Sequence, residues 1–560
     1  MSIRLTVDNQ AIVMPVDARI SIEKNSPVLN ENVGSFSYPF PVPTEKNRAV
    51  LGYPGRLERA GDIPIKLFRL EDNGVHIISG EIEIDSVTSA DTGIVLQSGN
   101  TEFSKRMKDK KLEDINYGAE SWPTNDDALD SKLAYWDTAN TTDNGKYVMS
   151  SFLIKPISGT TPIVINRQNK VTEDFQPTIL KMFVFAMLRV GNFSLQFRIS
   201  FIIRKIYESA GYLIKEDSFK PSQFNSAILF GKIINVADHG TFIIPTLASL
   251  EYSTLMPDVK VLDFINTVQS MFCLVFDLDE KKKEVHITFK KDIFLNESLD
   301  TTKITELTGW EHTEKRETKG YSLQYTDQDN ENDTKYDYEI MTTAFTMLPA
   351  VGVEGATVRV IYGVSQAEYE AGEPYYNRDY IVVKNAADVL EWIEIGRLKA
   401  SREGYGENEI EIDVNIPDQQ KYTWTGQIFE CPTLPGVTYG IDSPLVPVPY
   451  LAISIYRGRK GWGACNYPYT SFDRVSIDGE IDAGVSLKPA YLYESVYKDF
   501  INWKTYRARE CTKYLKLTLI EVVQLQWRKR YVISGIPILL NQVSFEVPYS
   551  GIVKVNGFTA

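Results

Sequence analysis

Short runs of alternating apolar and polar residues fill the first hundred positions of the chain. The alternation is clearest at residues 3–7, 63–67 and 77–84. A period of two places the apolar side chains on one face of a β-strand. The dipeptide Asn73-Gly74 separates two of these runs and favours a tight hairpin turn. The sequence therefore predicts an N-terminal β-domain.

The pattern changes to a helical period in the middle of the chain. Apolar residues recur three and four positions apart from Ile199 to Ala210, and Gly211 can end the helix that this spacing predicts. A strand is expected to resume at residues 212–214. This is the first sign of an α+β region.

A second helical pattern covers residues 257–272 and leads into two strand-like runs at 274–276 and 285–289, with a polar turn at 279–283 between them. Helix, strand, turn and strand in this order predict an antiparallel hairpin with a helix over one face.

The C-terminal part returns to strand patterning after a candidate helix at about 490–510. Strands are predicted around residues 514–518, 526–533, 538–540 and 543–547, and the turn Ser534-Gly535 should pair two of them.

These changes of pattern divide the chain into six segments, in a β-rich, multidomain α+β protein with short covering helices. The predicted segments are an N-terminal β-domain with a proline-rich arm (1–104), an insertion or peripheral subdomain (105–190), a helix-hairpin domain (191–310), a β-rich domain (311–430), a loop-rich insertion (431–488), and a C-terminal helix with antiparallel strands (489–560).

A proline-rich stretch at residues 35–43 has the most specific local pattern of the chain. Its prolines fix φ and restrict the preceding residues to extended conformations, which excludes a helix and makes a regular central strand unexpected. Its aromatic residues Phe36, Tyr38 and Phe40 therefore have fixed directions. Two interpretations stand: a proline-rich crossover within one domain, or a stiff arm that docks on a neighbouring domain or subunit. In the second, these three residues form the candidate interface.

Composition narrows the class of protein. The 560 residues are 43% hydrophobic and 24% charged, which is ordinary for a soluble globular protein, and no apolar run is long enough for a membrane anchor. The N-terminus alternates as a strand does and carries Asp8, so a signal peptide is not expected. The net charge of −14 argues against affinity-driven binding of nucleic acid, although solubility alone also accounts for it.

Candidate chemistry is sparse. None of the four histidines has a metal-ligand spacing, and the four cysteines form no CxxC pair. A Cys273/His286 nucleophile pair is conceivable across the central hairpin, but the apolar run around Cys273 favours a buried, structural thiol. We therefore expect no enzyme, no catalytic residue, no metal and no cofactor.

Two charged patterns are most simply interpreted as solvent-exposed surface. The alternating carboxylates from Asp327 to Asp333 resemble a calcium loop, but Asn332 stands at the turn-glycine position and no glutamate closes the loop. The basic runs at 281–283 and 528–530 could meet acidic patches on a partner and are expected to be ordinary solvated faces.

Three stretches of the chain stand out together: residues 33–43 with Asn47-Arg48, the centre at 206–212 and 261–265 leading into Phe276-Asp277, and the C-terminal helix with 517–545. In these stretches the chain resembles the tail-hub proteins of long-tailed bacteriophages, the tail-tip or baseplate hub family, in the version found in phages and prophages of Bacteroidetes.

The resemblance implies a structural virion protein of the tail, made in the host cytoplasm. It implies a homotrimer whose antiparallel β-barrel-like tube domains form a ring under the sixfold tail tube or distal tail protein, with a threefold spike, fibre or tip on the opposite face. DNA would pass through the channel without specific binding. The arm from Phe36 to Phe40 would then make contacts in the assembly.

Two alternatives remain open from the sequence. A carbohydrate-binding or carbohydrate-active β-protein could use tryptophan residues as stacking platforms, and the candidates are Trp392, Trp424, Trp462 and Trp503. A hub of a phage-tail-derived contractile injection system would have the same architecture, and genomic neighbours would separate it from the virion protein.

Overall fold

The computed structural model of the chain describes residues 3–29, 34–54, 66–121, 145–156, 163–166, 178–180, 188–236, 249–279, 281–295, 299–300, 305–306, 311–313, 320–325, 338–342, 356–362, 375–384, 390–396, 400–401, 407–424, 427–437, 445–462, 465–473 and 484–559.

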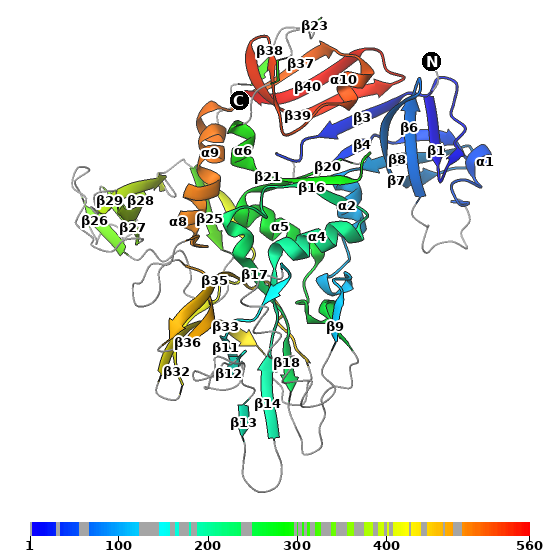
Figure 1. The fold of residues 1–560 in the computed structure, drawn as a ribbon. Helices are drawn as coiled ribbons and strands as arrows, with labels where there is room; N and C mark the ends of the chain where they lie inside the picture. The colour runs from blue at the N-terminus through cyan, green and yellow to red at the C-terminus, as the bar shows by residue number, and fades with distance from the viewer. Residues whose placement is uncertain are drawn as a thin grey trace.

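One 15-stranded sheet contains strands from both ends of the chain (Figure 1). Its main path runs in the order β2-β1-β6-β7-β8-β4-β3-β39-β40-β37-β23. The strands on this path are β1 Ile3–Val7, β2 Gln10–Ala11, β3 Ile20–Asn25, β4 Ser35–Ser37, β6 Lys66–Asp72, β7 Val75–Val87, β8 Asp91–Ser98, β23 Thr305–Glu306, β37 Glu510–Lys516, β39 Ile536–Val547 and β40 Ile552–Thr559. The strands off the path are β5 Phe40–Pro43, β22 Leu299–Asp300, β24 Glu311–Thr313 and β38 Arg530–Ile533.

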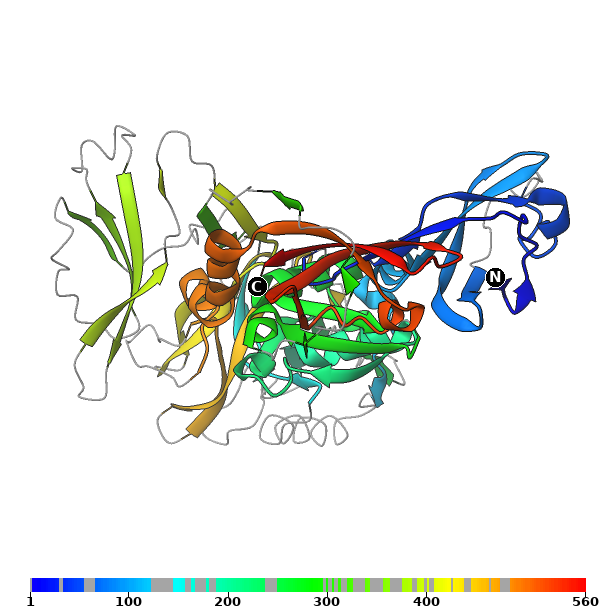
Figure 2. The same ribbon diagram turned by 90° about the horizontal axis from the view of Figure 1, so that it is seen from above.

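The two ends of the chain join where β3 pairs with β39, antiparallel, with Ile20 opposite Val547. Figure 2 shows this continuous run of strands from above. One apolar core lies under it, to which both ends contribute: Ile22 and Leu96 pack in the same buried cluster as Phe545. We call β1–β8, β37–β40 and the short helix α10, Leu519–Val523, the sheet unit.

The predicted β-rich character, with several antiparallel sheets and few helices, is confirmed. The predicted barrel-like tube is not seen in the described residues: their strand pairings form open paths, and none closes into a barrel.

The two predicted central helices and the hairpin are confirmed. Helix α4 spans Ile199–Ser209 and α5 spans Val261–Phe272, and the chain turns out of them at Gly211 (φ 82°) and at the left-handed Cys273 (φ 51°). Strands β20 (Leu274–Asp279) and β21 (Glu284–Phe289) form the antiparallel hairpin.

Strand β16 (Leu213–Asp217) lies where a strand was expected after the first helix. It pairs with β21 in parallel, and the sequence pattern did not predict this pairing. Helix α2 (Asn100–Met107) leaves β8 through Gly99 and packs on α4, with the rings of Phe103 and Tyr207 stacked 4.7 Å apart. We call α2, α4, α5, β16, β20 and β21 the central unit, and its core is separate from that of the sheet unit.

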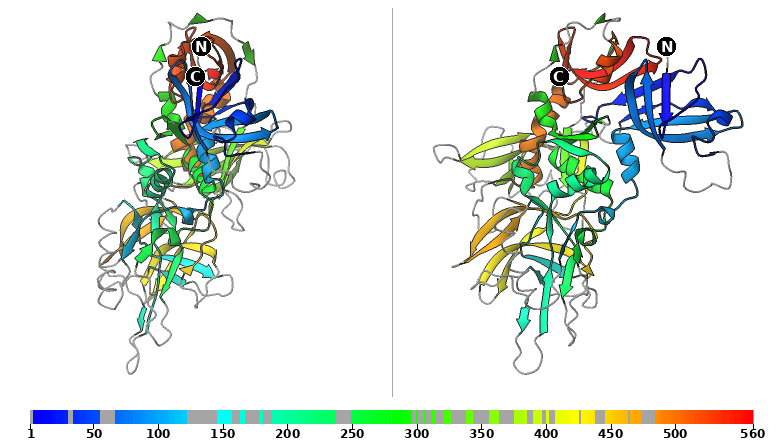
Figure 3. Two further views of the ribbon diagram at one scale, coloured as in Figure 1. Left: turned by 90° about the vertical axis from the view of Figure 1, so that its right-hand side faces the viewer. Right: turned by 45° about the vertical axis from the view of Figure 1, so that its right-hand side comes forward.

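Below the central unit, smaller sheets bring together the two predicted insertions, 105–190 and 431–488 (Figure 3). One sheet is β10 Tyr147–Val148, β15 Gln196–Arg198, β17 Ala227–Phe230, β35 Ile453–Trp462 and β36 Cys465–Ser471. A second is β12 Ile163–Ile165, β11 Phe152–Pro156, β33 Gln427–Val437 and β32 Asp418–Trp424. A third is β13 Thr178–Leu180, β14 Leu188–Phe193, β18 Ile233–Val236 and β34 Leu445–Val446.

Other described strands pair in smaller sheets. They are β9 Ala119–Ser121 with β19 Ser249–Glu251, β25 Gly320–Tyr325 with β31 Glu407–Ile412, and β26 Tyr338–Thr342, β27 Thr357–Tyr362, β28 Tyr375–Lys384, β29 Leu390–Gly396 and β30 Ala400–Ser401.

A long helical segment leads from these lower sheets back to the sheet unit. It consists of α8 Pro489–Leu492, a π-helical turn Tyr493–Tyr497, α9 Lys498–Asn502 and a second π-helical turn Trp503–Arg507. It packs beside α6, Lys290–Leu295. The predicted helix ran slightly too far, because β37 already begins at Glu510.

The last strands follow the prediction in part. Ser534 and Gly535 have positive φ values of 54° and 75° and form the predicted turn between β38 and β39. Strand β39 is continuous where two strands were predicted, because a register shift between Leu540 and Gln542 interrupts the alternation of its side chains.

Candidate functional site

The predicted proline-rich arm lies inside the large sheet. Residues Ser35–Ser37 pair with β3 on one side and β8 on the other, so the expectation that this stretch avoids a central strand is wrong for its first part. Tyr38 and Pro39 interrupt the pairing, and β5 (Phe40–Pro43) then continues along β8. Prolines lack the N–H donor that a longer central strand needs, which keeps each piece short.

The three candidate interface residues differ in exposure. Phe40 is 5% exposed and packs in the chain's own core. Phe36 is half-buried and meets Tyr38 edge to face, with ring centroids 5.8 Å apart. Tyr38 is 52% exposed, and its hydroxyl donates to Glu23 Oε2 at 2.8 Å, which raises the pKa of the phenol. Their role in an assembly stays a prediction.

Asn47, the first residue of the Asn47-Arg48 pair in the family resemblance, joins the segment around Val13 to the end of β5. Its buried side-chain amide donates to the carbonyls of Val13 and Pro43, both at 2.9 Å, and its Oδ1 accepts from the Val13 N–H at 2.8 Å. Sequence reasoning gave Asn47 no role, since Val13, which exchanges two of its three hydrogen bonds, is 34 positions away.

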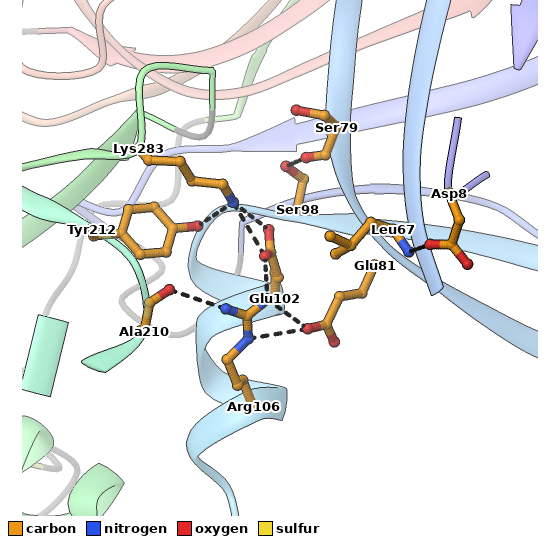
Figure 4. A network of polar contacts seen from close by, with 10 residues as sticks. All are labelled: Asp8, Leu67, Ser79, Glu81, Ser98, Glu102, Arg106, Ala210, Tyr212 and Lys283. Atoms are coloured by element: carbon orange, nitrogen blue, oxygen red, sulfur yellow. Dashed lines mark hydrogen bonds and ion pairs between the residues drawn. The ribbon is translucent and has the colours of Figure 1, made fainter. Parts of the chain in front are cut away.

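A buried charge network lies where α2 meets the sheet unit (Figure 4). The Glu102 carboxylate, 1% exposed, accepts from Arg106 at 2.9 Å and from Lys283 Nζ at 3.2 Å. Lys283 also donates to the Tyr212 hydroxyl at 3.3 Å. Arg106 bonds Glu81 of β7 through two nitrogens, at 2.9 and 3.1 Å. We call Glu81, Glu102, Arg106, Tyr212 and Lys283 the Glu102 cluster.

Burial and charge act against each other at Glu102. Desolvation raises the pKa of its carboxyl, and the nearby Lys283 and Arg106 only partly offset that rise. A buried carboxylate that is held by two cations is costly to leave unpaired. The arrangement fits a structural contact between segments.

A second charge cluster lies across the three strands of the central sheet. Register places Asp277 of β20 opposite His286 of β21, and His286 opposite Glu216 of β16. Arg528, from the loop after α10, donates to Asp277 Oδ2 at 3.2 Å and also bonds Glu216. His286 Nδ1 lies 3.1 Å from Glu216 Oε2. We call these four residues the Arg528 cluster.

The two carboxyl groups of the Arg528 cluster shift in opposite directions. Desolvation raises the pKa of the half-buried Asp277, although Arg528 and His286 oppose this. Partial burial also favours neutral Glu216, but the bond to Arg528 and the contact with His286 hold its pKa below its ordinary value.

The two clusters correct one prediction. Lys283 and Arg528 belong to the basic runs that were expected to be solvated faces, and both make ion pairs within the chain. The partners Arg528 and Asp277 are 251 positions apart, so no local pattern signals the pair. Only the Glu102–Arg106 spacing of four on a helix was open to sequence reasoning.

The structure does not bring the conceivable nucleophile pair together. Cys273 ends α5 beside Leu274, which faces Phe289, whereas His286 faces Asp277. With a strand rise of about 3.3 Å per residue, the two side chains are roughly 10 Å or more apart along the hairpin. Cys273 is buried, as expected.

Trp503, one of the four predicted stacking platforms, is 4% exposed and donates its indole N–H to the Thr559 carbonyl at 2.8 Å. It cannot present a face to a sugar. Outside the described part of the structure lie the side chains of the other three, Trp392, Trp424 and Trp462. The same holds for residues 327–333, whose carboxylates resemble a calcium-binding loop.

Within the part of the chain that the structure describes, His, Cys, Asp and Glu side chains form no group of three or more suited to a metal ion. None of the helices in this part has the length and apolar composition needed to cross a bilayer.

The comparisons find a likeness among solved structures alone. No family model and no curated protein matches the chain. Among solved structures, the chain is similar to the 43 kDa tail protein of prophage MuSo2 from Shewanella oneidensis, with a TM-score of 0.33 and 7% sequence identity. The match covers 100% of this chain and 96% of that one. At this level the likeness does not assign a function.

Proposed function

We propose that the chain is a structural, non-enzymatic protein of a bacteriophage tail: a hub that joins the sixfold tail tube to a threefold tip, spike or fibre. In this proposal three copies form a ring, and DNA passes through its channel without specific binding. The protein acts in the virion tail without a cofactor, and its contacts with the ring neighbours and the tail tube carry the function.

The observation that supports this proposal most directly is the position of the three stretches that carry the family resemblance. The first lies in β4 and β5, and the third includes β38 and β39, in the same sheet. The second lies in α4, α5 and β20, and its Asp277 in β20 accepts a hydrogen bond from Arg528 of the third. Stretches that are far apart in the sequence therefore form one contiguous body.

The position of Tyr38 supports an assembly contact. Tyr38 is exposed on the link between β4 and β5, and both neighbouring strands hold that link in place. A tyrosine that is rigidly presented loses little conformational entropy on binding and supplies both apolar area and a hydroxyl.

The native mass of the purified chain, with negative-stain class averages of the same sample, tests the proposal. We expect a threefold particle with a central hole. The Tyr38→Ala variant should weaken the trimer, and Tyr514→Ala, which changes another partly exposed tyrosine, serves as the control. A monomer at every concentration, both alone and with the tail-tube protein of the same phage, would contradict the proposal.

A further inference from the structure

The contact between the sheet unit and the central unit differs in kind from the interior of either unit. Each unit has its own apolar core. Across the contact, Arg106 bonds Glu81, Lys105 lies 3.1 Å from Glu83, and Arg528 bonds Asp277 and Glu216. Ion pairs therefore cross the contact between the units on this side.

Helix α2 contacts both units, through β4 and β8 on one side and α5 on the other, and its buried apolar side chains belong to the central core. Phe103 and Met107 are buried in the central core, and Glu102 of the same helix is bound by Lys283. The side chain of Asn100 donates to the Phe276 carbonyl at 3.2 Å. The bonds from Arg106 and Lys105 to β7 consequently cross from one unit to the other.

An apolar contact joins the sheet unit to the central core near the C-terminal end of the chain, through Trp503 and Phe294, which pack in that core although they lie outside the elements of the central unit. Trp503 packs against Phe294 of α6 with ring centroids 4.7 Å apart, and against Phe558 of β40 at 6.1 Å. Leu539 of β39 is fully buried in the central core. Figure 1 shows α6 and α9 beneath the C-terminal strands, whereas α2 lies beneath β7 and β8.

Two chain connections between the units can accommodate a change of angle. Gly99, with φ 63°, links β8 to α2, and glycine reaches such conformations at no steric cost. Ala508 and Arg509 link the second π-helical turn to β37 as a short extended piece. Hinges consist of a few loop or element-terminal residues of this kind.

We propose that the Arg106–Glu81 bonds and the bonds from Arg528 to Asp277 and Glu216 form an electrostatic latch. When the latch opens, the sheet unit tilts away from the central unit about the apolar contact of Trp503 with Phe558. Parting two charged surfaces that water can rehydrate is much easier than parting an apolar core, so the latch side opens first.

Salt should open the latch, because partly exposed ion pairs weaken as ionic strength rises. The Arg528 side is the more sensitive, since 57% of the Glu216 side chain is exposed. The inference concerns contacts within one chain and holds whether or not the trimer of the proposed function forms.

Distance measurements across the latch test the proposal in the full-length protein. Spin labels on Leu67→Cys of β6 and Leu213→Cys of β16 report on the two units, because these side chains are 52% and 68% exposed. We expect one short distance at low salt. The double variant Glu81→Gln/Arg528→Met, and the wild type at about 1 M salt, should shift the ratio of short to long distances by roughly tenfold or more, equivalent to about 1.4 kcal/mol.

The matched control is Arg19→Met/Lys282→Met. It removes one exposed ion pair from each unit without touching the contact between them, and should leave the distance unchanged. If the latch variant fails to fold, the same distance is measured in the wild type over a salt series and in the conservative Arg528→Lys variant, and these two measurements test the latch. A short distance that persists in the wild type at high salt, and in every folded latch variant, would overturn the latch.

Discussion

At the scale of single residues, buried and half-buried charges lie where distant parts of the chain meet. Lys283 and Glu102 are 181 positions apart, and Arg528 and Asp277 are 251 positions apart. If one partner of such a pair is removed, the other charge stays unpaired in a poorly solvated site. Loss of either partner therefore lowers the stability of the fold. These residues are structural, and they determine how the segments fit together.

Glu216 gives the contact between the units a dependence on pH. Its pKa is held below the ordinary value of 4.5, so its contribution to the free energy of unfolding is complete above pH 4.5 and is lost as pH falls through the lowered pKa. We expect Glu216→Gln to be less stable than the wild type at neutral pH, with a difference that shrinks in acid. Urea unfolding across a pH series measures this difference.

The control for Glu216 is Glu546→Gln, which removes an exposed carboxylate 3.7 Å from Arg19 within the sheet unit. In this control, the free energy of unfolding should fall with decreasing pH as it does in the wild type. A gap between Glu216→Gln and the wild type that stays constant from neutral to acid pH would contradict the assignment.

Asn47 is expected to stabilise the sheet unit by satisfying buried backbone groups. Asn47→Ala leaves the Val13 N–H without its acceptor and removes both amide donations. An unsatisfied buried backbone group costs about 1–3 kcal/mol, and a loss in this range should appear in urea unfolding. Gln10→Ala, at an exposed strand position, is the control. Equal stabilities for the two variants would show that water replaces the amide.

At the scale of elements, aromatic side chains join the long helical segment to the sheet unit. Helix α9 and its flanking π-helical turns carry Trp503 under β40, where the indole N–H binds the last described residue, Thr559. The predicted helix was placed correctly to within a few residues, but apolar spacing at a helical period did not predict its π-helical turns.

Replacing Trp503 should separate the loss of packing from the loss of the hydrogen bond. We expect Trp503→Ala to cost roughly 3–5 kcal/mol, as for other large aromatic residues in cores. Trp503→Phe keeps most of the ring contact and loses the bond to Thr559, so it should cost distinctly less. Chemical unfolding followed by circular dichroism compares them, and similar costs for both variants would show that the hydrogen bond dominates.

At the scale of the whole molecule, the N-terminal and C-terminal segments form one folding unit. Strand β3 has β39 as a neighbour, and Ile22 shares a buried cluster with Phe545. The segments 1–104 and 489–560 were derived separately from the sequence, and the structure joins them in one sheet. Contacts between residues this far apart in sequence are formed at a high entropic cost of loop closure.

Removing residues 552–560 should therefore disrupt the N-terminal strands as well. The deletion takes out β40, which lies between β39 and β37. We expect limited proteolysis to cut within residues 3–98 of the shortened chain while the same sites stay protected in the full chain. Expression of residues 1–104 alone is the complementary test, and a cooperative unfolding transition in that fragment would contradict a shared core.

The sequence by itself determined the elements with strong local patterns. The central helices, the hairpin after α5 and the turns at Asn73-Gly74 and Ser534-Gly535 follow from apolar spacing and from residues that tolerate positive φ. It also determined the stiffness of the stretch around Tyr38, because proline restricts φ wherever it occurs.

Only the tertiary structure decided how these elements combine. It decided that Phe40 is buried while Tyr38 is exposed, that β3 pairs with β39, and that Arg528 binds Asp277 rather than solvent. Each of these facts depends on partners hundreds of positions away or on which face of a strand a neighbour covers. Local periodicity carries no information about such partners, because it fixes the face of an element and not what lies against it.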